Sequence, residues 1–352
     1  EKGTVESPEM LRTLLDRRKQ LDASYVNLLD HESRLCFKST YVASPLPSGR
    51  DEATKSIDPA NWADRLRGRR ATRPFTRSGA EAAEFRSRVR IGIPRVLSLY
   101  STAPLFRTYF ETLGISDRNV VFSPPTSEKL YSAGARYGSV DTCFPSKVVQ
   151  SHLHHLLFEA HQPPGNPLNF IFFPSVTCLS TFVEKTVDST SCPIVAGTPN
   201  VMKAAFNREI PFFENAGIDY VDGVVTLEEP NYFKHQMFEM WGSRLRITED
   251  ESNFAIDQGW EALKRFDTEM QQLGKETLEK VEAENRIAIL VLGRPYHADP
   301  GLNHGLLDEL QASGYPTITI RSIPKDEAWL GKWFQPDLAA GLIENVFDIR
   351  DV

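Results

Sequence analysis

The sequence is poor in cysteine and has no long apolar run. Its 352 residues include four cysteines, Cys36, Cys143, Cys178 and Cys192, which are too few for a disulfide scaffold. We therefore expect a reducing, cytoplasmic setting. A membrane-spanning helix needs about 18 consecutive apolar residues, and no stretch of this sequence comes near that length. The first ten residues also contain no apolar signal-peptide core. We expect no membrane partner.

An excess of positive charge is also absent. The chain has 40 Lys and Arg against 47 Asp and Glu, which gives a formal net charge of −7. A protein that neutralises nucleic-acid phosphates needs a basic surface, so nucleic acid is excluded as the main partner. The sequence has no G-x-G-x-x-G, G-x-x-x-x-G-K-[ST] or G-x-S-x-G motif, so no dinucleotide site, P-loop or nucleophile elbow is indicated.

Residues 1–87 differ from the rest of the chain. Leu11, Leu14, Leu15 and Leu21 have the spacing of an amphipathic helix. A polar stretch with several prolines follows, and nine arginines lie between Arg65 and Arg90. This stretch is either a solvated linker, or an extended arm wrapped on a domain, or a docking strip for an acidic partner.

From residue 88 the pattern becomes α/β, because apolar strands alternate with helices as in βαβ units with a parallel sheet. The expected strands are residues 88–96, 119–124, 168–176 and 192–198, and the expected helices are residues 102–114, 127–138 and 146–160. The helix at 127–138 is expected to end at Gly138. These elements form a first lobe over residues 88–253.

A long polar helix is predicted over residues 254–284, and it could bridge two lobes. A strand at 286–296, a helix at 303–314 and a strand at 315–320 then begin a second lobe. Only about 30 residues follow, so this second lobe, residues 286–352, is incomplete, and its tail from Trp333 supplies a helix. The predicted organisation is therefore an N-terminal arm (1–87), a first lobe (88–253), a bridging helix (254–285) and a partial second lobe (286–352).

The stretch "DTCFPSK" places Cys143 at the start of a helix. Asp141 or Thr142 can serve as its N-cap, and Pro145 suits the first helical turn. Cys143 then lies beside the positive end of the helix dipole, which favours a thiolate and hence a ligand or nucleophile. Lys147, one turn further on, adds positive charge. The alternative is a small residue that caps a helix.

Cys178 follows a buried strand and so lies where α/β sheets bind their ligands. Cys192 begins the expected strand at 192–198, which places it at the opposite edge of the sheet unless the intervening residues fold back. Together with Cys143, these cysteines make a candidate metal site. Soft thiolates suit zinc or an iron–sulfur cluster. A [4Fe–4S] cluster usually takes four thiolates, so three cysteines leave one iron for another ligand, with Tyr296, His297 and His304 as candidates.

Two groups of histidines differ in how well they suit a functional site. His152, His154 and His155 are consecutive or nearly so on a helix and point in different directions, so we interpret them as ordinary surface residues. The segment "GRPYHADPGLNHG" instead follows a strand and precedes a helix, and its Arg294, His297 and His304 suit an anionic ligand or a proton donor. The alternative is a structured loop whose polar groups are satisfied internally.

Five motifs in order resemble one family, the proteins related to the activators of 2-hydroxyacyl-CoA dehydratases. They are "IGIPRVLSLY", "SVDTCFPSKVVQSHLHHLL", "FIFFPSV", "CPIVAGTPNVMKAA" and "VLGRPYHADPGLNHG", within roughly residues 88–322. The resemblance implies two flavodoxin-like or Rossmann-like lobes with a cysteine-ligated cluster between them. Cys143 and Cys192 lie in its motifs, and Cys178 lies in the matching region.

The resemblance implies an iron–sulfur protein that takes part in electron transfer or dehydratase-type reduction. Cys143, Cys178 and Cys192 would hold a [4Fe–4S] cluster, while Lys147, Arg294, His297 and His304 would contact the cluster, a substrate or a partner. An activase-type ATPase module or a dehydratase subunit is the expected partner, in a dimer, a fusion or a larger complex. The alternatives are a scaffold or binding module without a cluster, and a metal-free enzyme that uses Arg294, His297 and His304.

Overall fold

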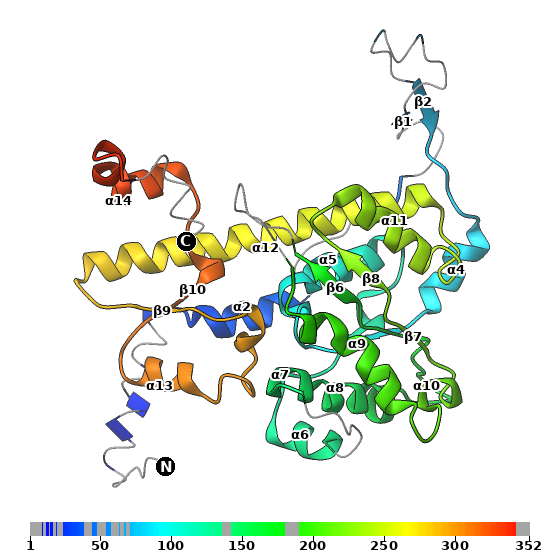
Figure 1. Ribbon diagram of the computed structural model, residues 1–352, viewed down its shortest axis with the longest axis horizontal. Coiled ribbons are helices and arrows are strands. Elements are labelled where there is room, and N and C mark those ends of the chain that lie inside the picture. The colour runs from blue at the N-terminus through cyan, green and yellow to red at the C-terminus, as the bar shows by residue number, and fades with distance from the viewer. Residues whose placement is uncertain are drawn as a thin grey trace.

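The computed structural model describes residues 24–38, 44–47, 54–57, 71–135, 142–179 and 190–342, together with a few single residues before position 71. Three predictions lie outside these ranges: the helix through Leu11 and Leu21, the helix end at Gly138, and Asp141 as a helix N-cap. Two lobes are joined along one long helix, and the strand pair β1 (Thr54–Ile57) and β2 (Ala71–Pro74) projects from one of them (Figure 1).

The first lobe is built on a parallel four-stranded sheet, which confirms the predicted α/β class. Its strands lie in the order β4-β3-β5-β7. Ile91 pairs with Val120 on one side and with Phe170 on the other, so β3 is central. In chain order this is 2-1-3-4, the flavodoxin-like arrangement, whose direction reverses between the first and third strands. The strands are β3 (Ile91–Ile93), β4 (Val120–Phe122), β5 (Phe170–Phe172) and β7 (Asp219–Val221).

The apolar run at 168–176 does not form one strand. It breaks after β5 at Pro174, and β6 (Ser175–Cys178) pairs in parallel with β8 (Val224–Thr226). The helices of this lobe are α4 (Ala80–Arg88), α5 (Leu99–Thr112), α6 (Glu128–Gly134), α7 (Phe144–Lys147), α8 (Val149–His155), α9 (Pro193–Phe206), α10 (Phe212–Asn215) and α11 (Pro230–Trp241), and α8 continues into a wider turn over Leu156–Ala160.

The strand expected at 192–198 is wrong, because these residues begin helix α9. Cys192 is the N-cap and Pro193 is the first helical residue, a position where a missing N–H costs nothing. The buried residues of α9 recur at helical spacing through Val195, Met202 and Phe206. The β-branched residues Ile194 and Val195 at its start suggested a strand. The apolar residues that continue at helical spacing to Phe206 instead favour the helix.

Helix α12 (Glu249–Ala283) confirms the expected long helix and begins five residues earlier than predicted, because Thr248 and Glu251 form a reciprocal capping box. One face is buried throughout its length and packs along α5. At their crossing a Cβ on Gly259 would lie 2.7 Å from the Leu105 carbonyl oxygen, so only glycine permits this approach. Figure 1 shows α12 running from the first lobe to the second.

The second lobe contains a two-stranded parallel sheet, in which Ile318 of β10 pairs with Leu290 of β9. Helix α2 packs against β10 and α12. The elements are α2 (Leu28–Phe37), β9 (Ile289–Val291), α13 (Leu306–Ala312), β10 (Thr317–Thr319) and α14 (Glu327–Ala339). The helices and strands expected after residue 285 are present.

The arginine-rich arm is held against the first lobe from the end of β2 onward. Arg73, within β2, pairs with the buried Asp250. Arg77 and the buried Arg86 both approach Glu251, at 3.2 and 3.6 Å. These arginines neutralise the acidic first turn of α12, so an arm wrapped on a domain describes them better than an exposed docking strip.

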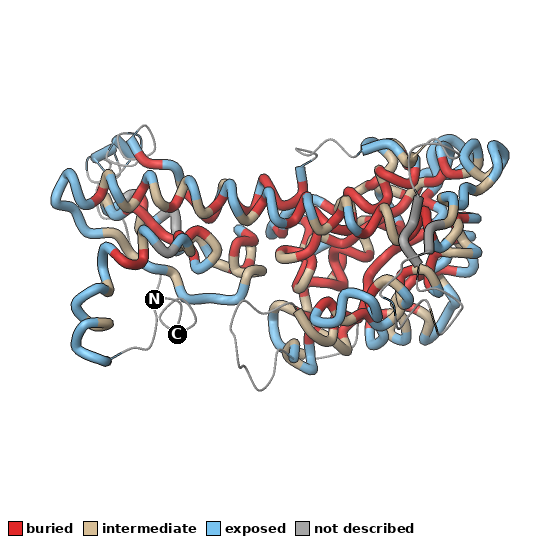
Figure 2. The backbone as a smooth tube through the Cα atoms, turned by 90° about the horizontal axis from the view of Figure 1, so that it is seen from above, coloured by how far each residue is buried: buried red, intermediate tan, exposed pale blue. Residues whose placement is uncertain are grey.

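The core is concentrated in the first lobe (Figure 2). Trp241 is fully buried and packs edge-on against Phe110, Phe170 and Phe172, with ring centroids 4.9 to 5.4 Å apart. Such edge-to-face aromatic contacts add to the stabilisation from buried area. No helix within the described ranges has the length and apolar character needed to cross a membrane.

Candidate functional site

Cys143 and Cys192 occupy equivalent positions at the starts of two helices. Cys143 is the N-cap of α7 and Cys192 is the N-cap of α9, and each helix has a proline in its first turn. The predicted helix start at Cys143 is therefore present, with the cysteine itself in the capping position in place of Thr142. The first N–H groups of a helix have no carbonyl partner within the helix, so each thiol lies beside backbone donors.

Hydrogen bonds hold these two helix starts together. Cys143 Sγ lies 3.5 Å from Ser146 Oγ, and the buried Thr198 Oγ1 lies 3.0 Å from the same oxygen. Ser146 is the third residue of α7 and Thr198 the sixth residue of α9, and both are almost completely buried. The positions of the two cysteine backbones are therefore fixed relative to one another.

Cys178 lies near Cys192 because the chain folds back. Residue 178 forms an antiparallel bridge with Thr190, and the Ser191 N–H donates to the Thr177 carbonyl over 2.7 Å. Cys192 follows two residues after Thr190. Of the two arrangements considered from the sequence, opposite edges or a fold-back, the structure has the fold-back.

A cavity of about 110 Å³ adjoins Cys192 at the carboxyl end of the first-lobe sheet. The start of α5 contributes its N-cap Ser98 and Ser101, and the returning chain contributes Thr190 and Cys192. Because the strand order reverses between β3 and β5, this is the crevice where open α/β sheets bind ligands.

The loop at 293–305 crosses from the second lobe to both cysteines. Tyr296 and Arg294 line the cavity beside Cys192. Burial raises the pKa of the Tyr296 phenol, and Arg294 opposes that rise. Tyr296 and Cys192 therefore share one cavity, and Cys143 is connected to the start of α9 through Ser146 and Thr198.

His304 and His297 lie on different sides of this loop. The His304 ring stacks on Phe144, next to Cys143, with centroids 5.7 Å apart. His297 Nδ1 accepts the Arg294 backbone N–H over 3.0 Å and lines a second cavity together with Arg294. The three candidates Arg294, His297 and His304 therefore do not converge on a single cavity. Lys147 is the half-buried last residue of α7.

The thiols form only a partial ligand set. Within the described ranges, no three His, Cys, Asp or Glu side chains come close enough to hold a metal ion. Cys143 is exposed, and Cys178 and Cys192 are half-buried. Cys36 differs from all three, because it is buried in the core and its thiol donates to the carbonyl of Tyr100 over 3.2 Å. Burial raises the pKa of Cys36 to about 12.

The interpretation of His152 as a surface residue is wrong. His152 is fully buried, and its ring nitrogens lie 2.7 Å from Ser123 Oγ and 2.9 Å from Thr126 Oγ1. Thr126 also donates its N–H to Asp299 of the second lobe, over 3.1 Å. This polar network joins the lobes beneath the site. Nothing in the sequence marked it, since its members are far apart along the chain.

The fold and the site define a class: a flavodoxin-like α/β protein with two helix-capping thiols at the switch point of its sheet, facing a loop from a second lobe. The sequence matches the CoA enzyme activase uncharacterised domain over residues 90–323, and the chain belongs to that family. This confirms the resemblance inferred from the five motifs. No curated protein and no solved structure matches the chain.

Proposed function

We propose that this protein is an iron–sulfur component of an acyl-CoA dehydratase-type reducing system. Cys143 and Cys192 would supply thiolate ligands, and Cys178 would be the third. The observation that carries the proposal is that two helix-capping thiols, from segments about 50 residues apart, begin helices joined by the Ser146–Thr198 hydrogen bond, and that Cys192 lines a cavity with Tyr296 at the switch point of the sheet. A bound cluster would supply one-electron transfer.

The residues around the thiols suit a charged group. Thiolate-ligated clusters carry negative charge, and Arg294 together with the N-terminus of α9 would offset it. Tyr296 would donate a hydrogen bond toward a cluster sulfur or serve as an oxygen ligand. Since no three ligands are gathered within the described ranges, binding would have to bring the three cysteine side chains closer together.

Membership of this family supports the proposal of an acyl-CoA dehydratase-type reducing system. The family description names CoA enzyme activases, so we expect a dehydratase subunit or an activase-type ATPase module as partner. A reducing, cytoplasmic setting would keep the half-buried thiols free for ligation.

The test is iron and acid-labile sulfide per chain after anaerobic reconstitution, with visible spectra before and after dithionite. About four irons and a band that bleaches on reduction are expected. Cys143→Ala and Cys192→Ala should each lose most of the iron, and Cys178→Ala should lose it if this residue is the third ligand. Cys36→Ala is the matched control and should retain it, because its thiol is buried away from the site.

A second candidate is a binding module of the same fold without a cluster. The partial ligand set within the described ranges favours it. It predicts no iron above background after reconstitution, equally in the wild-type chain and all four alanine variants. That result would refute the iron–sulfur proposal.

A further inference from the structure

The sheet of the second lobe has an open edge at β9. Its two parallel strands lie in the order β10-β9, and within the described ranges no other strand pairs with β9 (Figure 1). Ile289 donates its N–H to the carbonyl of Pro316, the residue before β10, over 2.9 Å. The backbone polar groups of successive strand residues point to opposite sides, so the N–H and C=O of Leu290 point away from β10. This edge can therefore accept the backbone of a further strand.

The side chains along this edge are apolar and exposed. Ile287, Leu290 and Leu292 are 70%, 46% and 74% exposed. Natural edge strands are usually protected by charged residues, by proline or by a covering loop, and residues 287–293 contain no charged residue and no proline. A two-stranded sheet is also only marginally stable by itself. Both observations favour the addition of another strand at β9.

The sequence of the edge is nearly symmetric about Leu290. In RIAILVLGR, residues 286–294, a β-branched residue precedes and follows the leucine, the next positions are apolar, and an arginine stands at each end. In an antiparallel pair with a two-fold axis at Leu290, this residue lies opposite Leu290 of the second copy, and Ala288 lies opposite Leu292 of the second copy. Apolar side chains then meet along the whole edge, as stable cross-strand pairs require.

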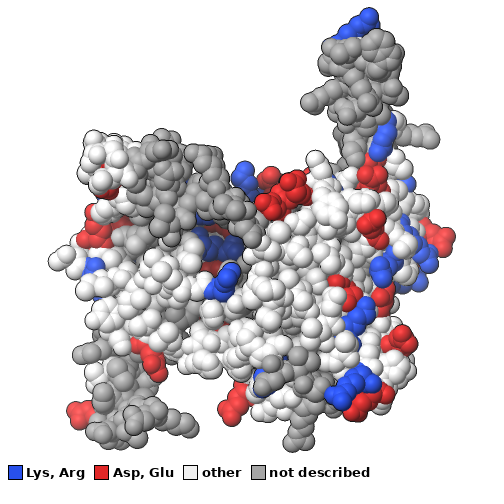
Figure 3. All heavy atoms as spheres, viewed as in Figure 1, with Lys and Arg blue, Asp and Glu red and all other residues white. Residues whose placement is uncertain are grey.

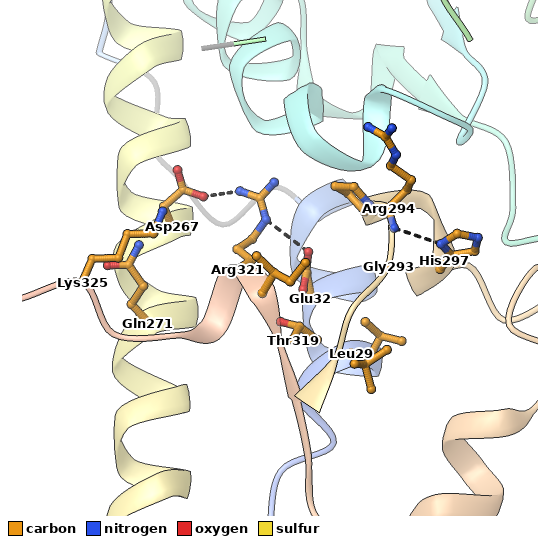
Figure 4. Close-up of a pocket in the computed structure, with 13 residues that line it drawn as sticks. Leu29, Glu32, Asp267, Gln271, Gly293, Arg294, His297, Thr319, Arg321 and Lys325 are labelled. Carbon is orange, nitrogen blue, oxygen red and sulfur yellow. Dashed lines mark hydrogen bonds and ion pairs between the residues drawn. The ribbon is translucent and has the colours of Figure 1, made fainter. Parts of the chain in front are cut away.

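The distribution of charge also favours a second copy as the occupant. Arg286 Nη1 lies 3.6 Å from Glu284 Oε2, and its Nη2 donates to the Gly314 carbonyl over 3.0 Å. Arg294 extends toward the first lobe, where it lines the cavity beside Cys192 (Figure 4). On the face seen in Figure 3, the surface over β9 is largely free of charged side chains. Two copies would therefore meet without like charges opposite one another, whereas a charged partner would find no opposite charge at this edge.

We propose that two copies of this chain associate through β9, antiparallel to one another, with Leu290 at the two-fold axis. The two sheets would join into one, in the order β10-β9-β9-β10. The Leu290 N–H of each copy would donate to the Leu290 carbonyl of the other, as in a hydrogen-bonded antiparallel pair. The inference goes beyond the proposed function, because this interface requires neither a cluster nor a thiol.

The first test is sedimentation equilibrium of the full chain over a range of concentrations. The wild-type mass should rise from that of one chain to that of two. Leu290→Lys should weaken the association at least about tenfold, because two ammonium groups would meet at the axis and two leucines would no longer be buried there. Ile210→Lys is the matched control, since Ile210 is 48% exposed and lies in the first lobe, and it should associate as the wild-type chain does.

Two results would contradict the proposal. A single chain at every concentration would leave the edge for a strand of a different protein and would overturn the pairing of copies. Equal association of the wild-type chain and Leu290→Lys would place the interface elsewhere. Both substituted side chains are exposed in the single chain, so each variant should fold, and circular dichroism checks this.

Disulfide trapping tests the register. In a hydrogen-bonded antiparallel pair the Cα atoms lie about 5.5 Å apart, within the roughly 4.4–6.8 Å that a disulfide spans. Leu290→Cys should therefore cross-link two copies on mild oxidation. Leu292→Cys is more exposed, but its counterpart in the second copy would lie about 13 Å away along the strand, so it should cross-link far less. More cross-linking through Leu292→Cys than through Leu290→Cys would overturn this pairing.

A last comparison separates this inference from the cluster. The triple variant Cys143→Ala/Cys178→Ala/Cys192→Ala should associate as the wild-type chain does, whether or not the wild-type chain takes up iron. It is also the background for the trapping experiment, so that no thiol of the candidate cluster site can cross-link. Loss of association in this variant would overturn the independence of the interface from the thiols.

Discussion

The hydroxyl of Tyr100 in the first lobe donates a hydrogen bond to Asp299 in the second, with 2.5 Å between Oη and Oδ2. Asp299 also accepts the backbone N–H groups of Thr126 and Gly301, over 3.1 and 2.8 Å. Both side chains are buried, at 1% exposure each. The pKa of Tyr100 is well above its ordinary value because of burial and the Asp299 charge, so the phenol remains a donor. One carboxylate thus anchors the loop at 293–305 to the first lobe.

Tyr100→Phe removes this donor and leaves the buried carboxylate with one partner fewer. Hydrogen bonds to charged groups contribute about 1.5–3 kcal/mol, so we expect the free energy of unfolding to fall by about 2 kcal/mol. Urea denaturation measures this change in the free energy of unfolding. Tyr232→Phe is the control, because Tyr232 is 55% exposed and should show almost no change. Equal stabilities of the two variants would mean that the contact between the lobes carries no net energy.

His152 makes stability depend on pH. Burial lowers its pKa from the usual 6.5 to about 4. Between these values the unfolded chain binds a proton that the folded chain excludes. The free energy of unfolding therefore falls as the pH falls from 6.5 to 4, by about 3 kcal/mol in total, and this contribution is complete above pH 6.5.

Urea denaturation across that pH range checks this prediction. In His152→Gln the corresponding slope should disappear, because glutamine can hydrogen-bond to Ser123 and Thr126 but does not titrate. His235→Gln should retain the slope of the wild-type chain, since the His235 side chain is 61% exposed. An unchanged slope in His152→Gln would assign the pH dependence to other groups.

The fold could be predicted where one local pattern decided it. The apolar strands and the long period of α12 were sufficient to place the sheet and the helix. Residues 192–198 were misassigned because Ile194 and Val195 favour a strand locally, while the period that continues to Phe206 favours a helix. Pro193 directly after Cys192 was the available signal for a helix start.

The site could be predicted only in part. Pro145 marked the helix start at Cys143, but the proximity of Cys192 and Tyr296 depends on how the lobes pack. His152 was misassigned for the same reason, since its hydroxyl partners lie 26 and 29 residues earlier in the chain. Burial that arises from tertiary packing leaves no periodic mark in such a short segment.

Gly274 permits the close contact between α12 and the second lobe. A Cβ at this position would lie 1.8 Å from the Ser322 carbonyl oxygen, far inside contact distance. Gly274→Ala should therefore destabilise the protein by about 1–3 kcal/mol, as overpacking does, despite the better helix propensity of alanine. Gly197→Ala, also within a helix but with open space around its Cα, should stabilise it by up to about 1 kcal/mol. Thermal denaturation of both variants gives the comparison, and equal effects would contradict the close packing.

The four thiols should differ sharply in reactivity in the metal-free, folded protein. Cys143 is exposed and should be alkylated by iodoacetamide first, and the half-buried Cys178 and Cys192 should follow. Cys36 should react only after unfolding, because it is 1% exposed and its pKa is about 12. At pH 8 only about one Cys36 side chain in ten thousand is then a thiolate, the reactive form. Mass spectrometry of timed digests resolves the four sites, with a urea-unfolded sample as the control in which all four react. Alkylation of Cys36 as fast as Cys143 in the folded protein would contradict its assignment to the core, and with it the use of Cys36→Ala as the control for iron binding.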